Sequence, residues 1–160
     1  MHLGAFSLLV PGYEPGIAFF CGTLGFELVE DIPQGHKRWV LVQAPDSPLR
    51  IVLARADTDA QRAALGNQAG GRVWLFLHTA DFATDHARLT RHGITFEETP
   101  RHEPYGTVAV FRDPFGNRWD LIEPKAGPQR SPSLFCSNPQ FTPCGTAQRW
   151  VSPAHPRKRA

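Results

Sequence analysis

The sequence has few of the features that mark extracellular or membrane proteins. Its three cysteines are too few, and odd in number, for a disulfide framework, so reduced thiols are expected. No apolar run approaches the roughly 20 residues that a membrane-spanning helix needs. The N-terminus also lacks the basic and then apolar pattern of a secretion signal. We therefore expect a cytoplasmic protein with no membrane partner.

Acidic residues are missing from the C-terminal part of the chain. Six of the 17 Lys and Arg residues follow Pro124, but none of the 15 Asp and Glu residues does. The net charge of +2 therefore comes from this part and is no evidence of a nucleic-acid partner for the fold. Residues 125–160 also contain six prolines, with almost no apolar periodicity. This composition predicts a Pro-rich basic tail that is disordered or loosely docked on the fold.

The rest of the chain contains the same series of elements twice. The first copy is an apolar strand at 5–10, a helix at 13–24, a strand at 26–30, and a hairpin of strands 38–43 and 50–54. The second is a strand at 72–77, a helix at 82–92, a strand at 94–98, and a hairpin at 106–123. Gly25 precedes Val52 by as many residues as Gly93 precedes Asp120. The repeat predicts two βαβββ modules in one α+β domain at 3–124.

Each predicted hairpin follows a loop, at 32–37 in the first module and at 99–106 in the second. The second hairpin turns at Asp113-Pro114-Phe115-Gly116-Asn117. Pro114 presets φ for a turn, and Gly116 or Asn117 accepts a positive φ at low cost. This turn is the most specific local signal in the sequence.

Two βαβββ modules with a DPFGN turn before the last strand resemble the vicinal oxygen chelate superfamily. This superfamily includes glyoxalase I, bleomycin-resistance proteins and extradiol dioxygenases. Further support comes from Leu24-Gly25-Phe26-Glu27-Leu28 and from Trp119-Asp120-Leu121-Ile122-Glu123. The resemblance covers residues 3–124. It implies an open, cup-shaped mixed sheet with helices outside, a small-molecule ligand in the cup, and a homodimer.

The resemblance also implies four positions for metal ligands, one on the first and one on the last strand of each module. They fall on Ala5, Val52, Arg72 and Asp120. Only Asp120 can ligate a cation, because Ala and Val have no donor atom and Arg is always protonated. A catalytic divalent ion needs about three protein ligands. No cofactor is therefore expected, and a divalent metal is disfavoured.

A metal would need an unforeseen set of ligands, such as His2, Asp120 and Glu123, and His2 is a weak candidate. Strand alternation places a further set of side chains in the cup with Asp120. The predicted substrate-binding residues are Ser7, Val52, Arg72, Trp74, Phe76, Tyr105, Arg118 and Asp120. Two interpretations of Arg72 and Asp120 remain open. They form an ion pair that fills the cup, or Arg72 grips a ligand while Asp120 orients a donor or acts as a catalytic base.

The first functional hypothesis is a metal-independent protein that binds a small organic molecule in the cup. The alternative is a metal-dependent enzyme, either a glyoxalase-like lyase or isomerase or a dioxygenase. A third hypothesis is an interaction module that works through the basic tail. One fold hosts many reactions, so the resemblance alone does not choose among them.

Overall fold

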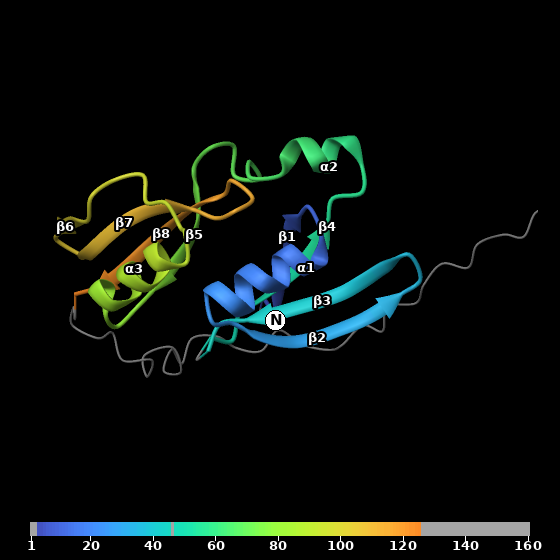
Figure 1. Ribbon diagram of the computed structural model, residues 1–160, viewed down its shortest axis with the longest axis horizontal. Coiled ribbons are helices and arrows are strands. Elements are labelled where there is room, and N and C mark those ends of the chain that lie inside the picture. The colour runs from blue at the N-terminus through green and yellow to red at the C-terminus, as the bar shows by residue number, and fades with distance from the viewer. Residues whose placement is uncertain (1–2, 46, 126–160) are drawn as a thin grey trace, which may run out of the picture. The chain divides into compact units, whose positions relative to one another are not determined.

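The computed structural model describes residues 3–45 and 47–125. The predictions for His2 and for the tail after Lys125 therefore lie outside the described residues. Two four-stranded sheets follow the two halves of the sequence repeat (Figure 1). The first has the order β1-β4-β3-β2 and comprises β1 (Ala5–Val10), β2 (Glu27–Gln34), β3 (Lys37–Gln43) and β4 (Arg50–Arg55). The second has the order β5-β8-β7-β6 and comprises β5 (Val73–His78), β6 (Arg101–Glu103), β7 (Gly106–Arg112) and β8 (Arg118–Pro124).

Both sheets are mixed in the same way. The first strand of each module runs parallel to the last, and the other neighbours are antiparallel. Four helical segments accompany them, namely α1 (Tyr13–Ile17), η1 (Ala18–Thr23), α2 (Asp59–Ala64) and α3 (Phe82–Arg91). The predicted α+β fold of paired βαβββ modules is confirmed.

The helix predicted over 13–24 is present, but its second half is a π-helix, η1. The wider turn appears in the hydrogen bond from the Leu24 amide to the Phe19 carbonyl oxygen, 3.0 Å long. Phe19 and Phe20 are both buried there. At Gly16 a side chain would press on Leu53 of β4, so the small residue lets α1 lie close to the sheet.

Two predicted loops proved partly wrong. Residues 32–37 are mostly strand, because β2 extends to Gln34 and a two-residue turn at Gly35, with a φ of 63°, leads into β3. The loop predicted at 99–106 contains β6. The strand predicted at 94–98 is reduced to one bridge between Phe96 and Phe111.

A hydrogen bond to the Glu98 side chain explains why strand pairing before β6 is limited to one bridge. The Val110 amide donates to a carboxylate oxygen of Glu98, 3.2 Å away, where a neighbouring strand would offer a carbonyl group. Backbone donors must be satisfied by some acceptor, and Glu98 provides it without extending the strand.

One hydrophobic core includes residues of both modules. Phe19 and Phe20 of η1 pack on Trp119 of β8, with ring centroids 6.4 and 6.0 Å apart. Phe111 of β7 stacks on the same indole at 5.8 Å. Side chains of β1, β4 and β8 contribute to this core, as Leu8 does. In Figure 1, α3 lies along the second sheet, and it contacts β8.

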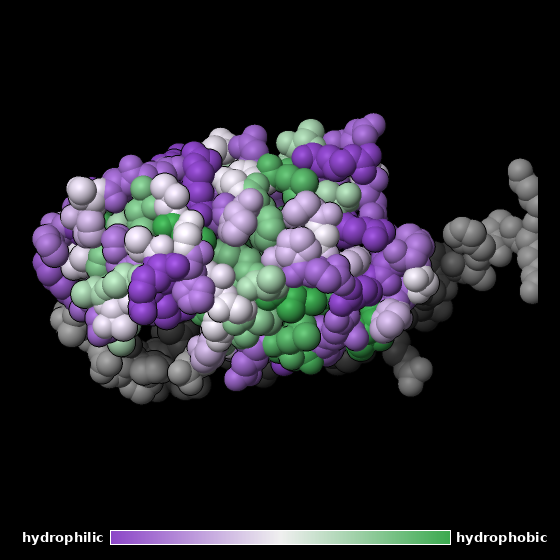
Figure 2. Space-filling model, in the orientation of Figure 1, coloured by the Kyte–Doolittle hydropathy of each residue, from purple (hydrophilic) through white to green (hydrophobic). Residues whose placement is uncertain are grey.

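Figure 2 shows charged and polar residues over most of one face, with apolar residues gathered in several places. Among the large apolar side chains that remain exposed, several belong to β2 and β3. They are Leu28, Val29, Ile32 and Trp39.

Candidate functional site

The four positions implied for metal ligands divide between the two sheets. Ala5 begins β1, and Val52 lies on β4 opposite Ser7. Arg72 immediately precedes β5, and Asp120 lies on β8 between Phe76 of β5 and Val110 of β7. Hydrophobic and cationic side chains thus occupy three of the four positions.

Asp120 carries an unusual carboxylate. Its Oδ1 is buried and receives no hydrogen bond from any described residue. Burial raises the pKa of Asp120, and Glu98 adds to this effect, while Arg101 and Arg118 partly oppose it. A carboxylate that loses water without gaining a partner holds its proton more tightly.

The two neighbouring arginines, Arg101 and Arg118, form ion pairs with other carboxylates instead of with Asp120. Arg118 donates from Nε to Glu97 at 2.8 Å, and Arg101 forms ion pairs with Glu98 and Glu103. The ion pair between Arg72 and Asp120, one of the two interpretations drawn from the sequence, does not form among the described residues. Arg72 is exposed in the segment that leads into β5.

The register of β5 explains why strand alternation failed there. Val73 pairs with Arg118, but the next pair is Leu75 with Trp119, so β5 contains one extra residue, Trp74. Such a bulge reverses the face on which the preceding side chains lie. Trp74 packs edge-on against Phe6 at 6.1 Å and against the core, so its predicted place beside Asp120 is wrong.

The other predicted residues are also dispersed. Phe76, Arg118 and Asp120 belong to the second sheet, whereas Ser7 and Val52 belong to the first. Tyr105 is exposed in the turn between β6 and β7. The structure therefore does not gather the eight predicted residues around one point, and their roles in binding stay predictions.

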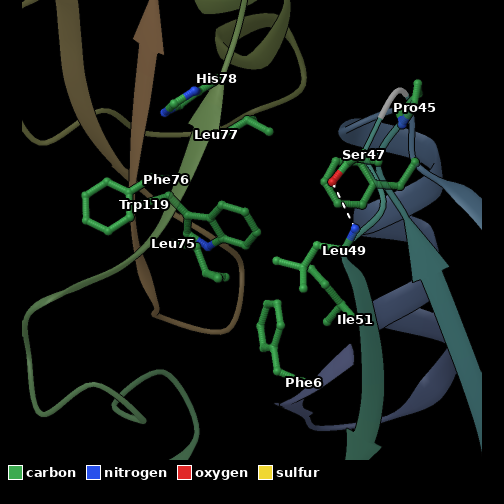
Figure 3. A pocket seen from close by; sticks show the side chains of 12 residues that line it. Phe6, Pro45, Ser47, Leu49, Ile51, Leu75, Phe76, Leu77, His78 and Trp119 are labelled. Atoms are coloured by element: carbon green, nitrogen blue, oxygen red, sulfur yellow. Dashed lines mark hydrogen bonds between the residues drawn. The ribbon is translucent and has the colours of Figure 1, made fainter. Parts of the chain in front are cut away.

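A cavity of about 510 Å³ lies between β1 and β4 of the first module and β5 and β8 of the second (Figure 3). Among the eight predicted residues, all of them within the described part of the chain, Phe76 alone lines it. Side chains from both modules and from the turn between β3 and β4 form the walls. They are Phe6, Phe26, Ala44, Pro45, Ser47, Leu49, Ile51, Leu75, Phe76, Leu77, His78 and Trp119.

Sequence reasoning missed most of this lining. Phe6, Ile51, Leu75 and Trp119 line the cavity, but none of them is among the eight predicted residues. Figure 3 shows Leu75 and Trp119 directed toward the first module, and Leu49 and Ile51 on the opposite side. No motif marks such a cavity, because it depends on where the two modules leave space between buried faces.

Possible ligands for a metal do not gather in the described residues. Within residues 3–45 and 47–125, no three His, Cys, Asp or Glu side chains lie close enough together to hold an ion. Glu123, proposed as a partner of Asp120, accepts a hydrogen bond of 2.8 Å from the Phe82 amide at the start of α3. In the same part of the chain, no helix is long and apolar enough to cross a membrane.

The sequence model of the Glyoxalase/Bleomycin resistance protein/Dioxygenase superfamily matches residues 2–121. The chain belongs to this superfamily. An uncharacterized protein of Shewanella frigidimarina is 47% identical over 120 residues, which are 73% of this chain and 89% of that protein.

Two solved structures of other proteins are similar to this chain in both sequence and fold. TnmS3, an antibiotic binding protein from Streptomyces sp. CB03234, is 31% identical, with a TM-score of 0.64 over 78% of this chain and 97% of that one. UcmS2 is 30% identical, with a TM-score of 0.68 over 77% and 98% of the two chains. The family predicted from the sequence is thereby confirmed.

Proposed function

We propose that this protein binds a small organic molecule and does so without a metal ion. The observation that carries the proposal is the chemistry of the four superfamily positions, where Ala5, Val52 and Arg72 supply no ligand for a cation. Asp120 alone leaves a divalent ion short of the roughly three protein ligands that it needs. Similarity to an antibiotic binding protein supports a binding role.

A cavity of suitable size also supports binding. Sites for drug-sized molecules usually enclose about 300–1,000 Å³ and are mostly apolar, with a few polar groups. The cavity between the modules has this volume and this character. Binding and sequestering a compound requires affinity alone, so no catalytic group has to be found in the site.

Metal content decides between this proposal and the enzyme alternative. Full-length protein, dialysed after purification, should contain far less than one equivalent of Ni, Zn, Mn or Fe by elemental analysis. Native mass spectrometry of the same sample should show a bound organic compound, or binding of one from a panel of organic compounds. One equivalent of metal that survives dialysis and disappears in Asp120→Ala would contradict the proposal.

We further propose that two copies associate. The exposed apolar side chains of β2, including Leu28 and Ile32, support a contact with a second copy, since apolar surface gains free energy when it is covered. Light scattering on the full-length protein tests this, and a monomer at all concentrations would contradict it.

A further inference from the structure

Apolar side chains make up most of the cavity lining that the structure describes. Among its twelve lining residues, all within the described part of the chain, there is no Asp, Glu, Lys or Arg. Serine and histidine supply the polar side chains, at Ser47 and His78. A charged ligand would lose hydration on entering such a site and would gain no opposite charge from these twelve residues, which is unfavourable.

Aromatic side chains contribute a large part of the lining. Phe6, Phe26 and Trp119 all reach the cavity, and Trp119 is fixed because its Nε1 donates to Asp113 at 3.0 Å. Aromatic walls favour aromatic ligands, since ring pairs gain from edge-to-face and offset contacts beyond the burial of their area. Because the Trp119 side chain is already held in place, binding loses less conformational entropy than it would at a mobile wall.

Ser47 offers a directional polar contact. Its Oγ accepts a hydrogen bond of 3.2 Å from the Leu49 amide, the dashed line in Figure 3. A hydroxyl has one proton and two acceptor sites. The Ser47 Oγ accepts from Leu49, and no described residue accepts the Ser47 proton, which can therefore be donated to an oxygen of the ligand.

We propose that this cavity selects an uncharged aromatic compound that carries a hydroxyl or carbonyl oxygen. The proposal rests on the proposed small-molecule binding and adds the site and the class of ligand. It differs from a site built around Asp120, which would favour a ligand with a positive charge or a strong hydrogen-bond donor.

Three naphthalenes of nearly equal size test the charge preference. They are 2-naphthalenemethanol, which is neutral, 2-naphthoate, which is an anion near neutral pH, and 2-naphthylmethylamine, which is a cation. Calorimetric titration of the full-length protein should show that the alcohol binds at least about tenfold more tightly than either ion. Equal or tighter binding of an ion would overturn the inference and leave small-molecule binding intact.

A charge placed in the wall provides the second test. Leu49 lines the cavity and is 38% exposed, so Leu49→Lys should fold. The variant should shift the preference about tenfold toward 2-naphthoate. Leu3→Lys is the matched control, because Leu3 is 72% exposed, precedes β1 and does not line the cavity.

The control separates a local effect from the change in net charge. If Leu3→Lys and Leu49→Lys shift the preference equally, the cavity is not the site and the inference fails. Failure of all three naphthalenes to bind at about 1 mM would also overturn it. The proposed function would still be tested separately, by the metal analysis and by the search for a bound organic compound with native mass spectrometry.

Discussion

Replacing Asp113 with alanine removes the acceptor of four hydrogen bonds in one turn. Its Oδ1 accepts from the amides of Phe115 and Asn117, both at 2.9 Å. Its Oδ2 accepts from the Asn117 side chain at 2.8 Å and from Trp119 Nε1 at 3.0 Å. Asp113 is only 4% exposed, and Asn117 and Trp119 are 2% exposed. Water therefore cannot easily replace the lost oxygens.

The expected loss of stability follows from the buried hydrogen-bond donors that lose Asp113 as their acceptor. Leaving one unsatisfied costs about 1–3 kcal/mol, and the donors of Asn117 and Trp119 lie in the buried part of the turn. After partial relaxation, Asp113→Ala should lower the free energy of unfolding by about 3–5 kcal/mol. Urea denaturation followed by circular dichroism measures it.

Two further variants make the test specific. Asp113→Asn keeps the shape and lets the amide oxygen accept from the backbone, but its NH₂ then faces the donors of Asn117 and Trp119. Asp113→Asn should therefore lower the free energy of unfolding by about 2 kcal/mol, less than Asp113→Ala does. Asp59→Ala, which removes an exposed ion pair with Arg62, should cost under about 1 kcal/mol. A loss for Asp113→Ala as small as that for Asp59→Ala would refute the reasoning.

Three other variants test the segment between α2 and β5 and the buried carboxylate of Asp120. Gly66 has a φ of 68°, and a Cβ there would overlap the Phe115 carbonyl oxygen, so Gly66→Ala should cost about 3 kcal/mol or more. Gly70→Ala, with a φ of 62° but open space, should cost about 1 kcal/mol, and equal losses by urea denaturation would show that the contact is unimportant. Burial holds the pKa of Asp120 above its ordinary value of 3.8, so the folded state favours the protonated form and loses stability as pH rises through the raised pKa. Asp120→Asn should therefore unfold at higher urea than wild type near pH 7 and lose this advantage near pH 3, and an unchanging difference would refute the assignment.

The sequence repeat was enough to predict both modules, because turn residues and strand spacing are local signals. The prediction was wrong for the end of β2, where Pro33 and Gly35 indicated a loop. Proline lacks an amide donor, but β2 is an edge strand, and among the strands of the described residues it pairs with β3 alone. The missing donor therefore costs no ladder hydrogen bond. Edge position depends on sheet order, which local sequence does not contain.

Site prediction failed for a different reason. Strand alternation gives correct faces only while the register is regular, and the extra residue at Trp74 displaces every side chain on its N-terminal side. The positions after it remain correct, since Phe76 pairs with Asp120 as expected from alternation. One bulge, with no distinctive residue to announce it, thus separates Trp74 from the face of Asp120.

The turn that identified the family also holds one wall of the cavity in place. Asp113 holds the indole N–H of Trp119, and the same indole packs on Phe19 and lines the cavity. The hydrogen bond and the ring contact both hold the indole, so the position of this wall depends on the turn. The DPFGN sequence therefore connects hairpin formation, the core shared by the two modules and the shape of the proposed binding site.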